Sequence, residues 1–219
     1  MSDATRLVLV RHGESNVSVE GIVGGPKTCS GLSPFGVRQV EALRDRLAAT
    51  GEVRADVLLA STLRRAVETA EVLAPALGDL SVEQDEDLSE WLPGECDGLS
   101  WEEFTRRYRP EGWRFDPYEP FSPGGESLAE FQVRAASALS RVAREHAGRT
   151  VVIGCHGGIV EASMTAFLGL LHWRRDTRLA TSNASLTELE LRARDQVEGR
   201  APVWRLVRYN DAAHRAGVA

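Results

Sequence analysis

The amino-acid sequence predicts an α/β protein: a three-layer α/β/α sandwich around a mostly parallel sheet, which a late strand pair could make mixed. Two observations predict this fold. Short apolar runs alternate along the chain with segments whose apolar residues recur every three or four positions, a pattern typical of a sheet covered by helices on both faces. The 219 residues are 42% hydrophobic and 26% charged, as in ordinary globular domains. No clear boundary interrupts the pattern, so we expect a single domain over residues 1–219.

The first strand and the first helix have clear sequence signals. The apolar run at about 6–10 predicts a buried strand, and the Gly- and Ser-rich segment 13–31 that follows predicts a loop. Ser33 suits the N-cap position of a helix, and Pro34 suits its first turn. Gly51 is a typical residue for the end of that helix.

The next segment predicts a second strand and a second helix. The buried strand covers 57–60, and the pair Ser61-Thr62 is interpreted as the cap of the helix that carries Ala66, Ala70, Leu73 and Leu77. A short third strand is expected at 80–83. The acidic, turn-rich segment 85–98 predicts a loop.

An excursion from the sandwich is expected at about 99–125. Ser100 and Glu103 form a capping-box pattern at the start of a short helix that ends near Tyr108. The rest of the excursion contains prolines and aromatic residues, and we expect it to be ordered over the active site. Its predicted buried residues are Trp113, Phe115, Tyr118 and Phe121.

The C-terminal part predicts the remaining layers. A long helix is expected over 128–146, a central strand over 151–153 and a helix over 159–171. Two further strands are expected at 184–191 and 202–207. The apolar stretch that includes the central strand contains glycines, a histidine and a glutamate, so a strand, a turn and a packed helix explain it better than a membrane span.

Composition excludes several partners and suggests a compartment. The formal net charge is -6, which argues against general affinity for nucleic acid or an anionic membrane. The odd set Cys29, Cys96 and Cys155 lacks metal-ligand spacing, and free thiols in a reducing cytoplasm are the expected state. The N-terminus shows no signal-peptide pattern. The sequence leaves open whether the protein forms a homodimer.

Cationic and imidazole side chains follow three of the predicted strands. Arg11 and His12 follow the first strand, Arg65 lies in the first turn of the helix after the second, and His156 follows the central one. The carboxyl ends of parallel strands form the usual ligand-binding edge of an α/β sheet. Arginine binds a phosphate dianion with parallel hydrogen bonds, and a helix N-terminus adds backbone donors. Together with the carboxylate of Glu90, this set suits a phosphoryl group.

These segments resemble the histidine phosphatase superfamily, whose fold is shared with cofactor-dependent phosphoglycerate mutases. The matching segments occur in the family's order and cover most of the chain. They are Arg11-His12-Gly13-Glu14-Ser15, residues 61–70, Leu88-Ser89-Glu90 with Gly94 and Asp97-Gly98, Gly124-Gly125-Glu126-Ser127, His156-Gly157-Gly158, and Asn183-Ala184-Ser185.

The resemblance implies a role for each matched residue. His12 becomes the nucleophile that forms phosphohistidine, Glu90 becomes the proton donor, and Arg11, Arg65 and His156 hold the phosphoryl oxygens. The family's second arginine directly precedes an alanine, which selects Arg65 over its neighbour Arg64. No metal and no cofactor are implied.

This chemistry sets requirements for the protonation states. His12 must attack as the neutral imidazole, and a backbone carbonyl in the turn after Gly13 is expected to fix its tautomer. His156 is expected to be protonated, so that both of its N–H groups donate. Glu90 needs a pKa raised by burial or by the phosphate charge.

Departures from the family pattern concern the rest of the substrate. Ser18 occupies a position where many members carry asparagine, and Ile22 occupies one where a basic residue is common. The loop at 24–31 is longer than usual. The candidate substrate-binding residues are Ser15, Asn16, Ser18, Lys27, Thr28 and Gly157.

The residues at the strand ends and the family resemblance suggest three possible functions. The leading hypothesis is a metal-independent phosphatase that hydrolyses a small-molecule phosphomonoester. The alternative is a phosphoglycerate mutase-type phosphotransferase, which needs further cations for a second phosphate. The third is an inactive module that binds a phosphorylated ligand. A zinc site made by His12, Glu90 and His156 is also conceivable, but their spacing matches no zinc-enzyme motif.

Overall fold

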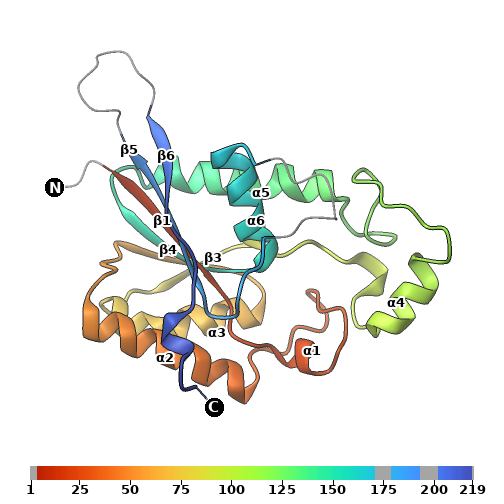
Figure 1. Ribbon diagram of the computed structural model, residues 1–219, viewed down its shortest axis with the longest axis horizontal. Coiled ribbons are helices and arrows are strands. Elements are labelled where there is room, and N and C mark those ends of the chain that lie inside the picture. The colour runs from red at the N-terminus through yellow and green to blue at the C-terminus, as the bar shows by residue number, and fades with distance from the viewer. Residues whose placement is uncertain (1–3, 171–178, 193–201, 219) are drawn as a thin grey trace.

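The computed structural model describes residues 4–170, 179–192 and 202–218. A six-stranded sheet lies between two helical layers, which confirms the predicted sandwich (Figure 1). The strand order is β3-β2-β4-β1-β5-β6. The strands are β1 (Thr5–Arg11), β2 (Val57–Ser61), β3 (Val82–Asp85), β4 (Thr150–Cys155), β5 (Leu186–Arg192) and β6 (Val203–Asp211). β1 to β4 run parallel, whereas β5 pairs antiparallel with β1 and with β6, so the sheet is mixed.

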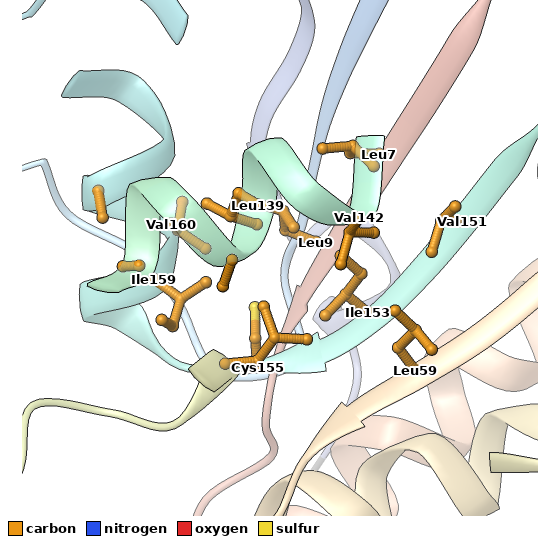
Figure 2. Packing of buried hydrophobic residues seen from close by; sticks show 14 of the residues in the cluster. Leu7, Leu9, Leu59, Leu139, Val142, Val151, Ile153, Cys155, Ile159 and Val160 are labelled. Carbon is orange, nitrogen blue, oxygen red and sulfur yellow. The ribbon is translucent and has the colours of Figure 1, made fainter. Parts of the chain in front are cut away.

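Alternation along the strands divides the core between the two faces of the sheet. Leu7 and Leu9 of β1 pack with helices α5 (Leu128–Glu145) and α6 (Gly157–Leu168). Val8 and Val10 pack on the other face with α2 (Pro34–Thr50) and α3 (Arg64–Leu73). Successive side chains of a strand point to opposite faces, so a run of buried residues is required in a central strand. Figure 2 shows the first of these clusters, with Leu139 and Ile159 facing the sheet.

Local capping explains where two of the helices begin and end. The Ser33 hydroxyl accepts a hydrogen bond from the Gly36 N–H at the start of α2, and Gly51 ends that helix in the left-handed region, as predicted. At the start of α5, Ser127 and Glu130 form a complete capping box. The predicted cap at the start of α3 was wrong, because the N-cap residue is Leu63 and it makes no side-chain cap hydrogen bond.

Several boundaries differ from the predictions. The expected loop after β1 contains one helical turn, α1 (Asn16–Val19), and β3 begins two residues later than expected. α6 starts directly after His156 and ends at Leu168, because Gly169 takes a left-handed conformation. The predicted end at residue 171 lies outside the described residues. Four short 3₁₀ helices complete the described elements: η1 (Ala74–Leu77), η2 (Glu86–Leu88), η3 (Gly94–Cys96) and η4 (Ala213–Arg215).

The excursion carries the short helix α4 (Trp101–Tyr108), which extends to the right in Figure 1. Phe121 is buried and stacks on Phe104, with 4.6 Å between ring centroids. The prediction of burial was wrong for Trp113 and Tyr118, which are 36% and 73% exposed. The Trp113 ring instead packs against the Arg109 guanidinium, 4.0 Å from its centroid, so a cation covers one face of the ring in place of the core. Phe115 is half-buried.

The structure also places the three cysteines and the apolar stretch around the central strand. All three cysteines are free thiols. None of the helices in the described ranges combines the length and the apolar character that crossing a membrane requires. The apolar stretch that raised this question is divided between β4 and α6.

Candidate active site

Strand pairing brings the two histidines together. β1 and β4 are parallel neighbours, and Arg11 lies opposite Cys155. The next residues therefore leave the sheet side by side: the His12 N–H donates to the Cys155 carbonyl at 2.9 Å. The rings of His12 and His156 then meet edge to face, with 5.2 Å between centroids. Both lie at the carboxyl edge of the sheet.

His12 is held in one tautomer. The side chain is buried, and its Nδ1 lies 2.6 Å from the carbonyl oxygen of Gly13. Its Nε2 accepts from the Nε–H of Arg65 at 3.2 Å. Nδ1 therefore carries the proton and Nε2 the lone pair. Burial, with the charge of Arg65 beside the ring, holds the pKa of His12 well below its usual value. His12 is thus neutral, as expected, and the carbonyl that fixes its tautomer belongs to Gly13.

Two contacts fix the turn that carries His12. A Cβ at Gly13 would come within 2.4 Å of the Gly36 carbonyl oxygen, so only glycine fits there. The Asn183 side chain donates to the His12 carbonyl at 3.1 Å, and the Ala184 N–H donates to the Arg11 carbonyl at 2.9 Å. Residues 183–185 were predicted to form a motif, but their contacts with the backbone of Arg11 and His12 were not predicted.

The adjacent arginines Arg64 and Arg65 have different surroundings. Arg65 is 4% exposed and points at His12, and its terminal nitrogens lie 3.5 Å from the Gly24 carbonyl oxygen. Arg64 is 68% exposed and forms an ion pair with Glu68 at 2.7 Å. The structure thus places Arg65 in the site and Arg64 on the surface.

Arg11 closes another side of the site. Its Nη1 donates to the Thr181 carbonyl, whereas its buried Nε has no partner among the described residues. Burial lowers its pKa, although a guanidinium remains charged. A Cβ at Gly157 would lie 3.8 Å from this Nε, so the first turn of α6 approaches the guanidinium closely. Buried donors are normally satisfied, and an anion would satisfy this one.

His156 is fully buried and hydrogen-bonded to a serine. Its Nε2 lies 2.8 Å from the Ser61 hydroxyl, and its Nδ1 has no partner among the described residues. Burial, followed by the charge of Arg65, holds its pKa well below the usual value. The expectation of a protonated His156 was therefore wrong for the ligand-free protein, because a cation is costly in a buried site that already contains two arginines.

The hydroxyls around His156 were not anticipated as site residues. Ser61 contacts the Ser89 hydroxyl at 3.3 Å, and Thr62 contacts the same hydroxyl at 3.2 Å. Ser61 ends β2, the strand next to β4, so sheet order places it beside His156. The position of Ser61 at the end of a strand could have indicated a site residue, but it was interpreted only as part of a helix cap.

Glu90 lies at the N-terminus of α6. The Gly158 N–H donates to one carboxylate oxygen and the Trp91 N–H to the other, each at 3.0 Å. A Cβ at Gly158 would come within 2.1 Å of the carboxylate, so the second glycine of His156-Gly157-Gly158 makes room for Glu90. These contacts hold the Glu90 side chain against the first turn of α6.

The predicted substrate-binding residues near the nucleophile lie in and beside α1. Ser15 is buried, and its hydroxyl contacts that of Ser18 at 2.9 Å. Asn16 is the first residue of α1, and Ser18 is exposed. Gly157 lies beside Arg11, as described above. Their role toward a substrate stays a prediction.

Lys27 and Thr28 belong to a loop that Asp97 organises. The Asp97 carboxylate accepts from the Gly25 N–H at 3.0 Å, from the Lys27 N–H at 2.8 Å and from the Thr28 hydroxyl. Lys27 is exposed and, with Glu95, lines a pocket of about 270 Å³. Because the Thr28 hydroxyl donates to Asp97, it already has a hydrogen-bond partner within the protein.

No three histidine, cysteine or acidic side chains are placed to share a metal ion in the described part of the chain. This also applies to His12, His156 and Glu90, the three residues of the zinc site that the sequence left conceivable. Instead, His12 Nε2 accepts from Arg65, a Glu90 carboxylate oxygen accepts from the Gly158 N–H, and His156 Nε2 is hydrogen-bonded to the Ser61 hydroxyl.

The low pKa values of the two histidines predict a specific NMR result. Both side chains should remain neutral from pH 7.5 down to about 6, where an ordinary histidine is largely protonated, and Nδ1 of His12 should carry its proton. Long-range ¹⁵N–¹H spectra of histidine-labelled protein test this. Since the unfolded chain binds these protons near pH 6.5, the free energy of unfolding should fall as the pH drops below that value. A cationic His12 at pH 7 would contradict the assignment.

The fold and this site define an α/β protein in which two histidines and an arginine meet at the carboxyl edge of the sheet. The chain belongs to the histidine phosphatase superfamily (branch 1), whose family model matches residues 7–209.

Relatives in this superfamily include both phosphatases and mutases. A metal-independent phosphoserine phosphatase of Arabidopsis thaliana is 29% identical over 221 residues, covering 99% of this chain and 86% of that protein. A 2,3-bisphosphoglycerate-dependent phosphoglycerate mutase of Brucella anthropi is 32% identical over 171 residues, covering 75% of this chain and 82% of that protein. The structure of a mycobacterial glucosyl-3-phosphoglycerate phosphatase has a TM-score of 0.75 and 28% identity, covering 94% of this chain and 99% of that one.

Proposed function

We propose that this protein is a phosphatase that hydrolyses a small-molecule phosphomonoester through a phosphohistidine on His12. The observation that carries the proposal is the state of His12: a buried, neutral imidazole whose Nδ1 is tied to the Gly13 carbonyl and whose Nε2 lone pair faces the Arg65 guanidinium. A phosphorus atom bonded to Nε2 would have its oxygens within reach of that guanidinium. The nucleophilic nitrogen of His12 and the charge-stabilising guanidinium of Arg65 are thus in direct contact.

The first step transfers the phosphoryl group to the protein. The Nε2 lone pair of His12 forms a bond to phosphorus while the bond from phosphorus to the ester oxygen breaks. The leaving oxygen takes the electron pair and receives a proton from Glu90. The Gly13 carbonyl stabilises the positive charge that the imidazole acquires, because it accepts the Nδ1–H.

The second step regenerates the protein. A water oxygen bonds to phosphorus while the bond from phosphorus to Nε2 breaks, and the electron pair returns to His12. Glu90, now a carboxylate, accepts the proton of this water and is restored for the next cycle. Inorganic phosphate leaves.

The remaining site residues act on the charge of the transferred group. Arg11 and Arg65 donate to its equatorial oxygens, where negative charge resides during transfer. Arg11 Nε and His156 Nδ1, which have no partner within the described ranges, are buried atoms that gain partners on binding. The charge of a phosphate dianion opposes the effect that lowers the pKa of His156 in the free protein, so substrate binding favours its protonation.

Two observations favour hydrolysis over mutase activity. A mutase needs additional cations for a second phosphate, yet three of the four arginines of the excursion make contacts within it: Arg106 and Arg107 pair with Glu103, and Arg109 stacks on Trp113. In addition, the phosphoserine phosphatase relative aligns with almost the whole chain, whereas the mutase relative aligns with three quarters of it.

The deciding experiment measures phosphate release from a panel of phosphomonoesters. The panel includes 3-phosphoglycerate with 2,3-bisphosphoglycerate, and formation of 2-phosphoglycerate is followed in the same samples. We expect phosphate release without isomerisation, and activity unchanged by EDTA. Rapid isomerisation with little phosphate release would identify a mutase, binding without turnover would identify an inactive module, and loss of activity that added metal restores would contradict metal independence.

Replacing Glu90 by glutamine tests the proton donor. We expect phosphohistidine formation from alkyl phosphates to slow by roughly 10²–10⁴-fold, the usual scale of general acid catalysis. Aryl phosphates with acidic leaving groups should slow much less, because their oxygen leaves without a proton. Glu95→Gln is the matched control, since Glu95 is an exposed carboxylate in η3, shortly after Glu90 in the chain. An unchanged rate with Glu90→Gln would assign proton donation to another group.

A further inference from the structure

We propose that Arg134 and Glu126 form a brace that positions Glu90 for proton transfer. The proposal rests on the proposed function, in which Glu90 donates a proton to the leaving group. Arg134 lies on α5 and Glu126 directly precedes the N-cap residue of that helix, so neither belongs to the loop that carries Glu90. We define this loop as the donor loop, residues 87–92.

Arg134 binds the donor loop through backbone carbonyls. Its Nη1 donates to the carbonyl oxygens of Asp87 and Ser89 at 2.8 and 3.0 Å, and its Nη2 donates to that of Glu90 at 3.3 Å. Nε and Nη2 also donate to the two carboxylate oxygens of Glu126, each at 2.7 Å. Every N–H of the guanidinium therefore has an acceptor. A side chain so fully engaged fixes the path of the backbone it touches.

Glu126 binds the other end of the same loop. Its carboxylate accepts from the Leu92 N–H at 3.0 Å, and its own N–H donates to the Leu92 carbonyl at 3.0 Å. Its carbonyl accepts from the indole N–H of Trp91 at 2.6 Å. The residues on both sides of Glu90 are thus held from outside the loop, while the Glu90 carboxylate extends to α6.

The brace is well suited to act through position rather than charge. Arg134 and Glu126 are mostly buried and form an ion pair with each other, and the charge of Arg134 lowers the pKa of His156 less than the charges of Arg65 and Arg11 do. What they supply is geometry, because planar forked donors specify directions that a lysine ammonium does not. A general acid must lie within hydrogen-bond reach of the leaving oxygen, so a small displacement of Glu90 suffices to impair it.

A neighbouring arginine on α5 provides a matched control. Arg141 also binds this region, through ion pairs with Asp85 at 2.8 Å and Asp87 at 3.2 Å. These contacts involve side chains at the start of the loop and do not reach Ser89, Glu90 or Leu92. Arg141→Met therefore removes an arginine of the same helix without removing the brace.

The test compares Arg134→Met, Arg134→Lys and Arg141→Met by rapid quench, measuring phosphohistidine formation from alkyl and aryl phosphates. We expect Arg134→Met to slow the alkyl esters by roughly 10- to 100-fold, a part of what general acid catalysis supplies, and the activated aryl esters by less than about 3-fold. Arg134→Lys should show the same selectivity to a smaller extent. Arg141→Met should leave both rates near wild type.

A double variant examines whether the effect passes through Glu90. In Glu90→Gln the acid is already absent, so adding Arg134→Met should cost little more with alkyl esters, whereas independent effects would multiply. Arg134→Lys supplies the same comparison if Arg134→Met does not fold.

Three results would overturn the proposal. Equal slowing of all leaving groups by Arg134→Met would mean a general structural role. No slowing would mean that Glu90 needs no brace, and multiplicative losses in the double variant would mean that Arg134 acts independently of Glu90. Failure of the proposed function would give different results from failure of the brace. The wild type would then form no phosphohistidine, or Glu90→Gln would slow alkyl and aryl esters equally.

Discussion

Replacing His12 by alanine is expected to abolish turnover, with a loss on the order of 10⁶-fold, as when the covalent nucleophile of another hydrolase is removed. Among the described residues, the imidazole nitrogen that accepts from Arg65 is Nε2 of His12, whereas His156 directs its Nε2 to Ser61. The substitution removes a buried ring whose pKa is held low, so the fold should persist. Phosphate release and acid-quenched labelling with a ³²P-phosphomonoester measure the effect.

The matched control for this variant is His146→Ala. His146 follows the last residue of α5 and precedes β4, so it lies toward the amino edge of the sheet, away from the carboxyl edge where His12 is. It should retain nearly full activity and the label on the protein. A His12→Ala protein that still turns over substrate at a substantial rate, or that still becomes labelled, would refute the phosphohistidine mechanism.

Replacing Arg65 by methionine is expected to give the second large loss, of roughly 10²–10³-fold in kcat/KM, the scale of removing one donor to a developing anion. Methionine is similar to the unbranched stem of the arginine side chain but lacks the guanidinium cation beside His12. It also removes a positive charge that lowers the pKa of both histidines. Those pKa values should therefore rise, which the NMR titration described above would detect.

Arg64→Met is the control for that variant. Arg64 lies on the same turn of α3 as Arg65, and the two side chains differ only in their surroundings. Arg64 is exposed and its partner Glu68 is four residues away on the same helix. Such a pair is worth about 0.3–0.5 kcal/mol, so activity should stay within a factor of about 2. Equal losses from both substitutions would indicate a general effect of charge on this surface and would remove Arg65 from the site.

The sequence carried reliable information where structure depends on neighbouring residues. Ser33 and Gly51 predicted both ends of α2 because capping and the left-handed turn are local. Alternating runs predicted the two-sided sheet. Local signals failed where a distant contact took precedence: Ser61 bonds to His156 instead of capping α3, and Trp113 packs on Arg109 instead of entering the core.

The composition of the candidate site was predictable from motifs at strand ends. Motif position selected Arg65 over Arg64, and the structure places Arg65 alone of the two beside His12. The need for a fixed neutral tautomer of His12 was also foreseen. The role of each of these residues in turnover remains a proposal for the experiments above.

Only the tertiary structure decided how the site is held together. The pairing of β1 with β4 puts His12 beside His156 although 144 positions separate them, from 12 to 156. Two further contacts join distant segments. Glu90 packs against Gly158, where a Cβ would not fit, and Arg134 donates hydrogen bonds to the donor loop. Capping and periodicity act over a few residues, whereas burial, pKa and side-chain contacts depend on which strands become neighbours. The sequence thus determined which groups are present, and the strand order determined which of them meet.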